Sequence, residues 1–363
     1  MISPPEVINP YQWDRQAWLP PLGLIPGGSF ALADLIALKT LEKLPVHLVF
    51  PVASPREGKN LARLLEKLRP LLGRLIDRVW VAFGGKKLGQ LPQALAAFPE
   101  VSIFPARQAL PPDQKFTPLG KGAVMRAWLY HLVINEKVTH PRAVIQFLDA
   151  DIRPAYFQPH WVVDAVGALF RFSVVEAVKI VYQRPRGGRL NTMLRSLLAL
   201  CPHAGVQTLL KLAYLLSGEI AGTLHFWTSL PFKSGYGVET LTLLAFALDR
   251  LKLAPDSADL EHLVQVYVGQ MDHRHAPLTS TRRKRGLDQM AGNVFHTLEE
   301  TLRKAGIFSW QGTPVEKPVL SLPIQEDPGG KTPGWLEVPI TDVTLPPLRT
   351  CVEIRAALGK AGL

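Results

Sequence analysis

Apolar runs alternate with helical patterns along the first half of the chain. Val46–Val52 is an apolar run that predicts a strand, and leucines then recur on one face of a predicted helix at about 60–73. Further strands are expected at Ile76–Phe83 and Val101–Phe104, followed by a helix at about 123–137. Strands that alternate with helices are typical of a parallel, doubly wound sheet, so we expect an α/β fold.

The stretch Ala143–Ile152 combines a buried strand with two carboxylates. Its apolar run ends at Leu148, and Asp149 and Asp151 follow. On an extended backbone, residues two positions apart point to the same face, and ligands of open α/β sheets collect at the carboxyl ends of strands. Both side chains could then address one Mg²⁺ or Mn²⁺ ion, which suits a nucleotide diphosphate. The simpler alternative is a turn, since Asp favours turns and Pro154 follows.

The second half of the chain continues the same pattern between proline-rich ends. Strands are expected at 174–183 and 264–268, and helices are expected at 160–171, 191–200, 205–216, 238–251 and 286–305. Residues 1–30 and the segment from about 310 are rich in proline, so we expect two extended arms.

Composition and net charge narrow the classes of partner and the cellular location but do not identify the function. The 363 residues are 47% hydrophobic and carry a net charge of +11, which favours anionic partners. The basic residues are spread out and no nucleic-acid-binding motif is present, so phosphorylated small molecules are the preferred partners. Cys201 and Cys351 form no disulfide framework and fit a reducing cytosol. The start of the chain does not resemble a signal peptide, and the apolar windows 161–182 and 206–230 contain too many charges to span a membrane.

Glycine-flanked basic residues form two further candidate sites. Gly120-Lys121-Gly122 opens a predicted helix, where backbone amides favour an anion, although a flexible hinge explains the glycines equally well. The triplet lacks the residues of a phosphate-binding P-loop, which excludes a Walker-type ATPase. Arg184, Arg186 and Arg189 could grip a phosphate or carboxylate, and the simpler alternative is a solvated basic loop.

Histidines and glutamates at loop ends complete the set of candidates. His273 and His275 follow a predicted strand, and an imidazole there could join Asp151 around a metal, although a lone His is more often structural. Glu219 and Glu239 stand beside glycines, where a carboxylate could hold sugar hydroxyls or cap a helix.

Taken in order, these short motifs resemble the glucosyl-3-phosphoglycerate synthase family and its mannosyl-transferring relatives, which are retaining glycosyltransferases with the GT-A fold. The resemblance covers roughly residues 46–308. It rests on Pro51 after the first strand, Gly120-Lys121-Gly122, Leu148-Asp149-Ala150-Asp151, Tyr182-Gln183-Arg184-Pro185, Gly187-Gly188-Arg189, Leu216-Ser217-Gly218-Glu219, Pro231-Phe232, Gly235-Tyr236-Gly237-Val238-Glu239, His273-Arg274 and Pro277-Leu278.

The resemblance implies a role for each motif. Asp149, Asp151 and His273 would hold Mg²⁺ or Mn²⁺ against the donor diphosphate. Catalytic roles would fall to Asp151, Lys121 and Glu239, the last of which would contact the donor sugar. The implied donor site is Pro51, Ala53, Glu57, Gly84, Lys121, Asp149, Ala150 and Glu239. The implied acceptor site is Gly188, Arg189, Asn191 and His275.

The resemblance also implies four segments and a homodimer, for which the cysteine content predicts a cytoplasmic location. The segments are an N-terminal arm and helix (1–45), a nucleotide-sugar-binding half (46–155), an acceptor-binding half (156–309) and a proline-rich C-terminal arm (310–363). The expected reaction transfers glucose or another hexose from a UDP- or GDP-sugar to 3-phosphoglycerate or a related small hydroxy acid. Its product would be a precursor of the compatible solute glucosylglycerate.

Departures from the family pattern fall in the substrate loops. Ala53–Glu57 and Phe83-Gly84-Gly85 differ from the usual nucleotide-binding loops, which leaves uridine and guanosine both open. Met271 and Ala276 replace two arginines of the family, and His275 replaces an asparagine. A less charged acceptor, a polyol or lipid acceptor, and a non-catalytic binding protein on the same scaffold therefore stay open.

Overall fold

A single mixed sheet organises the structure, a computed structural model that describes residues 23–115, 117–183, 188–201, 203–251, 262–273, 286–307, 319–324, 334–339 and 342–359. Its strand order is β1-β9-β6-β7-β5-β2-β3-β4. The strands are β1 (Leu24–Pro26), β2 (Val46–Val52), β3 (Arg78–Phe83), β4 (Val101–Pro105), β5 (Val144–Phe147), β6 (Ala177–Gln183), β7 (Ile220–Thr223) and β9 (Leu263–Gln270). Only β7 runs antiparallel to its neighbours in this sheet, and it joins β5 to β6.

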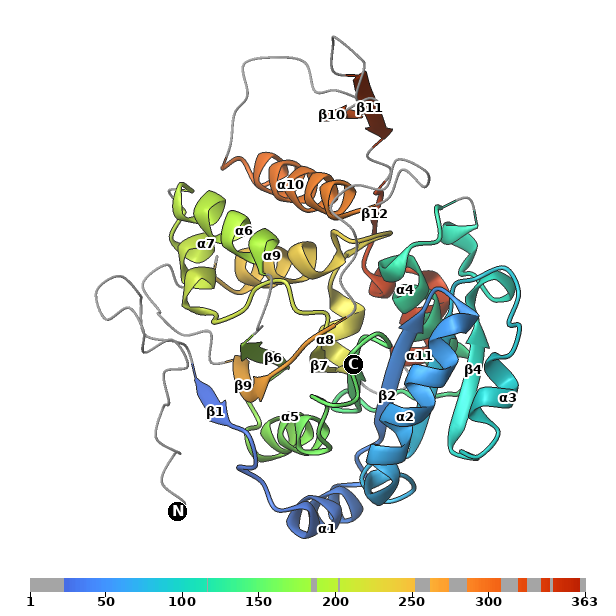
Figure 1. The fold of residues 1–363 in the computed structure, drawn as a ribbon. Coiled ribbons are helices and arrows are strands. Elements are labelled where there is room, and N and C mark those ends of the chain that lie inside the picture. Colours follow the sequence, from blue (N-terminus) through green and yellow to red (C-terminus); the bar gives the residue numbers. More distant parts are fainter. Residues whose placement is uncertain are drawn as a thin grey trace.

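Helices cover both faces of this sheet (Figure 1). One face packs against α1 (Leu32–Glu42), α2 (Gly58–Leu68), α3 (Leu91–Leu95) and α5 (His160–Arg171). The core on the other face is shared by α4 (Lys121–Ile134), α6 (Arg189–Ala199), α7 (Ala204–Thr208), α8 (Leu224–Ser229), α9 (Val238–Leu251), α10 (Leu287–Lys304) and α11 (Val352–Gly359), of which α10 packs on α9 and α11 on α4. Along β2, Val49 belongs to one core while Leu48 and Phe50 belong to the other, as alternation along a strand requires. The predicted α/β sheet with helices on both faces is therefore confirmed.

Strand β7 is an element of the sheet that the pattern did not predict, as is the short edge strand β1. The four residues of β7 lie inside an apolar window that continues directly into α8, so neither length nor periodicity separates strand from helix there. The helix expected at 205–216 is also shorter than predicted, since α7 ends at Thr208 and a 3₁₀ turn at Leu209–Lys211 follows.

The end of the chain is more structured than an extended arm. β12 (Thr344–Leu345) pairs antiparallel with β8 (Phe232–Lys233). Helix α11 then buries Ile354 and Leu358 in the core shared with α4. The expectation of an extended arm is thus wrong for residues 352–359, because these two apolar residues four positions apart form a helical face once the prolines end at Pro347. Within the preceding proline-rich region, β10 (Val319–Ile324) and β11 (Gly334–Pro339) form an antiparallel ladder.

None of the helices in the described ranges is both long and apolar enough to cross a bilayer.

Candidate active site

The two aspartates lie in a turn at the carboxyl edge of the central strands. Strand β5 ends at Phe147, earlier than predicted, so Asp149 and Asp151 converge through the turn and not through alternation along a strand. Asn60 of α2 fixes this turn, since its side-chain amide donates to the carbonyls of Ala150 and Ile152, both at 2.8 Å. The spacing of the sequence gives no signal for Asn60, which comes from a helix 90 residues earlier.

His273 joins the aspartates from the end of β9. Its Nδ1 lies 3.1 Å from Oδ1 of Asp151, and its backbone forms an isolated bridge with Ile152. One ligand atom from each of Asp149, Asp151 and His273 lies within 4.8 Å of the others. Burial opposes a charge on the imidazole, but the Glu219 and Asp151 carboxylates outweigh it and raise the pKa of His273 above its ordinary value.

Lys121 links this cluster to Glu239. Its Nζ lies 2.5 Å from Oδ1 of Asp149 and 2.7 Å from Oε1 of Glu239. Burial alone would lower the pKa of Lys121, yet the two carboxylates raise it well above the ordinary value, so the lysine stays charged. The three side chains come from α4, the turn after β5 and the first turn of α9, so three separate segments meet at one point.

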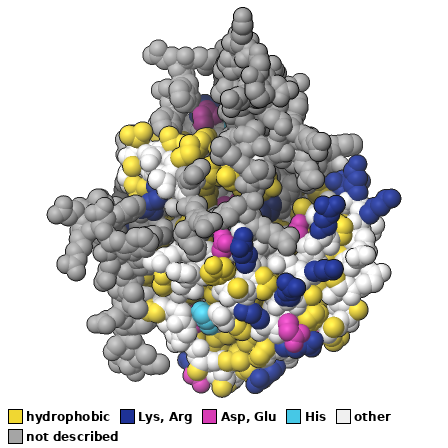
Figure 2. All heavy atoms as spheres, viewed as in Figure 1, with side chains coloured by type: hydrophobic (Ala, Val, Ile, Leu, Met, Phe, Trp, Pro, Cys, Tyr) yellow, Lys and Arg dark blue, Asp and Glu magenta, His cyan; other side chains and the backbone are white. Residues whose placement is uncertain are grey.

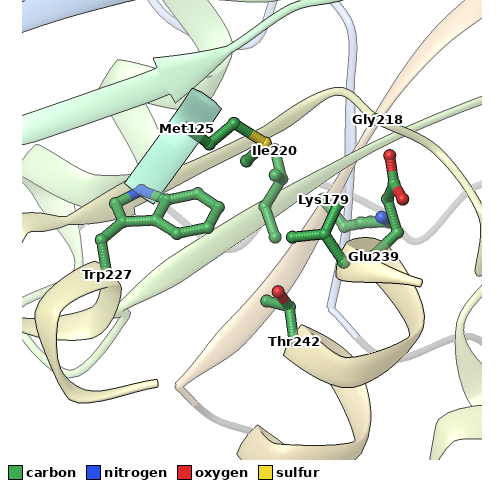
Figure 3. A pocket seen from close by; sticks show the side chains of 8 residues that line it. Met125, Lys179, Gly218, Ile220, Trp227, Glu239 and Thr242 are labelled. Atoms are coloured by element: carbon green, nitrogen blue, oxygen red, sulfur yellow. The ribbon is translucent and has the colours of Figure 1, made fainter. Parts of the chain in front are cut away.

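A buried layer lies beneath these groups. Glu219 is fully buried, with Oε1 lying 3.4 Å from Nε2 of His273 and Oε2 accepting from the Tyr182 hydroxyl at 3.1 Å. Lys179 of β6 donates to the Ser217 carbonyl, and burial lowers its pKa to about 8 against the opposing pull of Glu239 and Glu219. Figure 3 shows the Lys179 and Glu239 side chains converging in a small pocket. Met125, Ile220 and Trp227 contribute to its wall.

The charges of the site suit a divalent cation. Asp149, Asp151, Glu219 and Glu239 contribute four carboxylates, against which Lys121 and Lys179 supply two ammonium groups. Two negative charges are then left to neutralise when His273 is neutral, and two carboxylates with an imidazole suit Mg²⁺ or Mn²⁺. The excess of negative charge also affects Glu57, because burial and the nearby charge of Asp151 raise the pKa of its carboxyl group to about 7. The three potential metal ligands therefore fit the Mg²⁺ or Mn²⁺ ion that the sequence predicted.

Glycines at the start of α4 allow close contact with another part of the backbone. A Cβ on Gly122 would lie 1.9 Å from the Lys233 carbonyl oxygen, and one on Gly120 would lie 2.6 Å from that of Ser234. The amide of Ala123 donates to the same Ser234 oxygen at 3.0 Å. Close approach to the 233–235 backbone thus explains both glycines and replaces the hinge alternative.

We expect Gly122→Ala to destabilise the protein by about 1–3 kcal/mol, because the added methyl must displace the Lys233 carbonyl or the first turn of α4. The midpoint of thermal unfolding measures this effect. Gly359→Ala is the matched control, since a Cβ at Gly359 meets nothing within 4 Å. Equal midpoints for the two variants would contradict the prediction.

The remaining predicted donor residues lie at the ends of adjacent strands or directly after them. Pro51 belongs to β2, Ala53 and Glu57 follow it, and Gly84 follows β3. Strands β2, β3 and β5 run parallel, so these residues and Ala150 end at the edge of the sheet that carries the aspartates. Ser54 and Glu57 form a capping box that fixes the first of these loops. The structure therefore places the predicted donor residues along one edge.

The predicted acceptor residues are only partly within the described ranges. Gly188 adopts a left-handed backbone with φ of 86°, and Arg189 begins α6. Asn191 is buried, and its Oδ1 accepts from the Leu215 amide at 2.7 Å, which ties α6 to the following loop. His275 and the Arg184–Gly187 segment lie outside the described residues.

The fold and the site are those of a metal-dependent GT-A glycosyltransferase, with an Asp-x-Asp turn and a histidine at the carboxyl edge of a mostly parallel sheet. No protein-family model matches the chain. Named relatives narrow the class. The glucosyl-3-phosphoglycerate synthase of Mycolicibacterium smegmatis is 29% identical over 310 residues, which cover 83% of this chain and 86% of that protein. The synthase of the same name from Petrotoga mobilis is 25% identical over 345 residues, which cover 91% and 94%.

Solved structures give the same result. The Mycobacterium tuberculosis glucosyl-3-phosphoglycerate synthase in complex with Mn²⁺ and UDP-glucose is 25% identical, with a TM-score of 0.68, and the match covers 92% of this chain and 99% of that one. The mannosyl-3-phosphoglycerate synthase of Rubrobacter xylanophilus, at 22% identity and a TM-score of 0.70, shares the fold over 90% of this chain and 97% of that one. The resemblance to the glucosyl-3-phosphoglycerate synthases is therefore confirmed.

Proposed function

We propose that this chain transfers glucose from a nucleotide diphosphate donor to 3-phosphoglycerate or a closely related small hydroxy acid, with retention of anomeric configuration. One observation carries the proposal: the metal cluster of Asp149, Asp151 and His273 is joined directly to Glu239 through Lys121. The named relatives support the choice of substrates, because the Mycobacterium tuberculosis synthase was crystallised with Mn²⁺, UDP-glucose and phosphoglyceric acid.

Different residues of the site would bind different parts of the sugar-nucleotide donor. Asp149, Asp151 and His273 would hold Mg²⁺ or Mn²⁺, which when bound neutralises charge on the leaving diphosphate. Lys121 adds a fixed positive charge beside them, and pre-oriented charges of this kind contribute most of the rate enhancement in reactions that build up negative charge. Glu239, oriented by Lys121, would accept hydrogen bonds from the donor sugar.

Retention is proposed to proceed by attack on the same face of the sugar. In the described site, Asp149 and Glu239 are paired with Lys121, Asp151 with His273, and Glu219 lies behind that histidine. These pairings leave none of the four carboxylates as the evident nucleophile of a double displacement. The acceptor oxygen would bond to the anomeric carbon as the bond to the phosphate oxygen breaks, and the leaving phosphate would take the acceptor's proton. An inverted product by NMR would exclude this route.

A second candidate, transfer to a less charged acceptor, is favoured by Met271. This side chain is fully buried, and its amide donates to the Gln183 carbonyl, at a position where the resemblance implies an arginine. The function would then remain hexosyl transfer with a different acceptor.

Nucleic acid is a weaker candidate as a partner, since the Lys and Arg side chains in Figure 2 are interspersed with apolar and neutral groups on the described part of that face. We further propose a homodimer, as the resemblance implies, and a cytoplasmic location, which the low cysteine content fits.

A matrix of donors and acceptors tests the proposal. UDP-glucose, GDP-glucose and GDP-mannose are each combined with 3-phosphoglycerate, glycerate or glycerol, with Mn²⁺ or with a chelator, and products are identified by mass spectrometry. We expect a hexosylated acid that needs the metal. Hexosylated glycerol as the main product would support the second candidate, and the absence of metal-dependent transfer with every pair would contradict both.

We also expect the affinity for Mn²⁺ to rise with pH. Because the Glu219 and Asp151 carboxylates raise the pKa of His273, its imidazole keeps a proton to a higher pH than a free histidine, and a bound metal must displace that proton, so affinity should fall as the pH drops through that pKa. Calorimetry between about pH 6 and about pH 8, in buffers of different ionisation enthalpy, measures the proton release. Glu57→Gln removes a second group that titrates in this range. A pH-independent affinity in that variant would show that His273 is no ligand.

A further inference from the structure

The segment that begins at Asp342 is bound to the loop that leads into α9. The Asp342 carboxylate is buried and accepts hydrogen bonds from the Ser234 hydroxyl at 2.9 Å, from the Gly237 amide at 2.8 Å and from the Gly235 amide. Val343 adds two backbone bonds to Ser234: its amide donates to the hydroxyl at 3.0 Å, and its carbonyl accepts from the Ser234 amide at 2.8 Å. One carboxylate therefore satisfies three donors of a four-residue loop.

The opposite side of the loop contacts the first turn of α4. The Ser234 carbonyl accepts from the Ala123 amide, and Gly120 and Gly122 have no side chain that would separate the two backbones. The 234–237 loop is thus held between α4 and the C-terminal segment. Its conformation depends on residues more than a hundred positions away on both sides.

This loop determines where Glu239 lies. Helix α9 begins at Val238, directly after the loop, and Glu239 stands in its first turn, where its carboxylate meets Lys121 at 2.7 Å. A shift of the loop would move the start of α9 and with it this carboxylate. Beside the loop, Glu300 of α10 accepts from Lys233 and contacts Thr344, which fixes the neighbouring β8–β12 pair as well.

We propose that Asp342 is a positioning residue for the donor-sugar side of the site: it holds the 234–237 loop so that Glu239 stays paired with Lys121. The inference rests on the proposed function, because that function assigns Glu239 to the donor sugar. It gives the C-terminal segment a specific part in sugar binding, separate from the metal cluster on the other side of Lys121.

Asp342→Ala in the full chain tests the inference through three measurements. Amide hydrogen exchange in residues 234–239 should become at least about tenfold faster, because the loop loses bonds to a buried charge. The affinity for UDP in the presence of Mn²⁺ should change less than about twofold, whereas the extra affinity of UDP-glucose over UDP should fall by about tenfold. The kcat for glucose transfer should fall by a similar factor, with the KM for the acceptor little changed.

Two further variants keep the result interpretable. Ser234→Ala removes one bond to Asp342 and one to Val343, and serves where Asp342→Ala lowers the yield of folded protein. Glu353→Gln, an exposed carboxylate on α11 of the same segment, is the matched control and should match the parent chain. If amide exchange were unchanged in both Asp342→Ala and Ser234→Ala, Asp342 would not hold the 234–237 loop. If exchange became faster but the extra affinity of UDP-glucose over UDP stayed the same, Asp342 would have no positioning role. A parent chain that transfers hexose from neither UDP-glucose nor a GDP-sugar would instead contradict the proposed function.

Discussion

Replacing Asp151 by alanine is expected to lower the rate of hexose transfer by about three orders of magnitude. The substitution removes a carboxylate that lies 3.1 Å from His273 and belongs to the only group of three potential metal ligands in the described part of the chain. Loss of one of three protein ligands should also weaken Mn²⁺ binding by at least about tenfold. Steady-state kinetics and calorimetric titration with Mn²⁺ measure the two effects separately.

Asp34→Ala is the control for this prediction. Its carboxylate is exposed on α1 and lies 3.6 Å from Arg171, so its removal should leave both quantities unchanged. An Asp151→Ala protein that retains Mn²⁺ affinity but loses transfer would place Asp151 outside the metal site. One that retains both would remove the cluster from the reaction altogether.

Replacing Lys121 by methionine is expected to lower kcat by about 10²–10³-fold, which is typical of losing one fixed charge that stabilises a leaving group. The side chain keeps most of its volume but leaves Asp149 and Glu239 facing each other without the cation between them. In the absence of metal, the Lys121→Met variant should therefore melt at a lower temperature than the parent. Adding Mn²⁺ should raise the melting temperature of the variant by more than it raises that of the parent.

Lys39→Met is the control for Lys121→Met. It shows which effects follow from losing any partly buried lysine and which are specific to Lys121. Lys39 is paired with Asp77 at 2.6 Å and is similarly covered, but it lies on α1, outside the site. It should lower the melting temperature without reducing the rate per folded molecule. Equal losses of kcat in the two variants would show that Lys121 acts only through stability.

Local patterns predicted the sheet and the place of the two aspartates because each carries its own signal. Apolar runs mark β2, β3 and β5, and parallel strands bring their carboxyl ends to one edge, so Asp149 and Asp151 could be placed before any contact was known. Lys121, Glu239 and His273 needed the resemblance as well, since glycine-flanked charges and a lone histidine have ordinary structural explanations. The structure brings these residues to the same point.

Contacts between distant segments could not be predicted in the same way. Asn60 reaches the aspartate turn, and Asp342 reaches the 234–237 loop, from positions that no period or spacing connects to their targets. Lys179 looks like an interruption of an apolar strand, and its bond to the Ser217 carbonyl together with the nearby Glu239 and Glu219 carboxylates explains why a charge is tolerated there. Strand β7 is short and merges with the next helix, so its antiparallel direction follows from pairing and not from composition.

The close fit between Gly122 and Lys233 has a consequence for engineering. The two backbones touch where a single methyl group would not fit, so the start of α4, Lys233 and the 234–237 loop behave as one exchangeable unit. A chimera that imports the donor-side helix of a relative should keep that relative's loop as well, together with the residue that takes the place of Asp342. Helix α6, which carries the predicted acceptor residues Arg189 and Asn191, begins elsewhere in the chain, so we expect acceptor preference to be open to redesign without dismantling this unit.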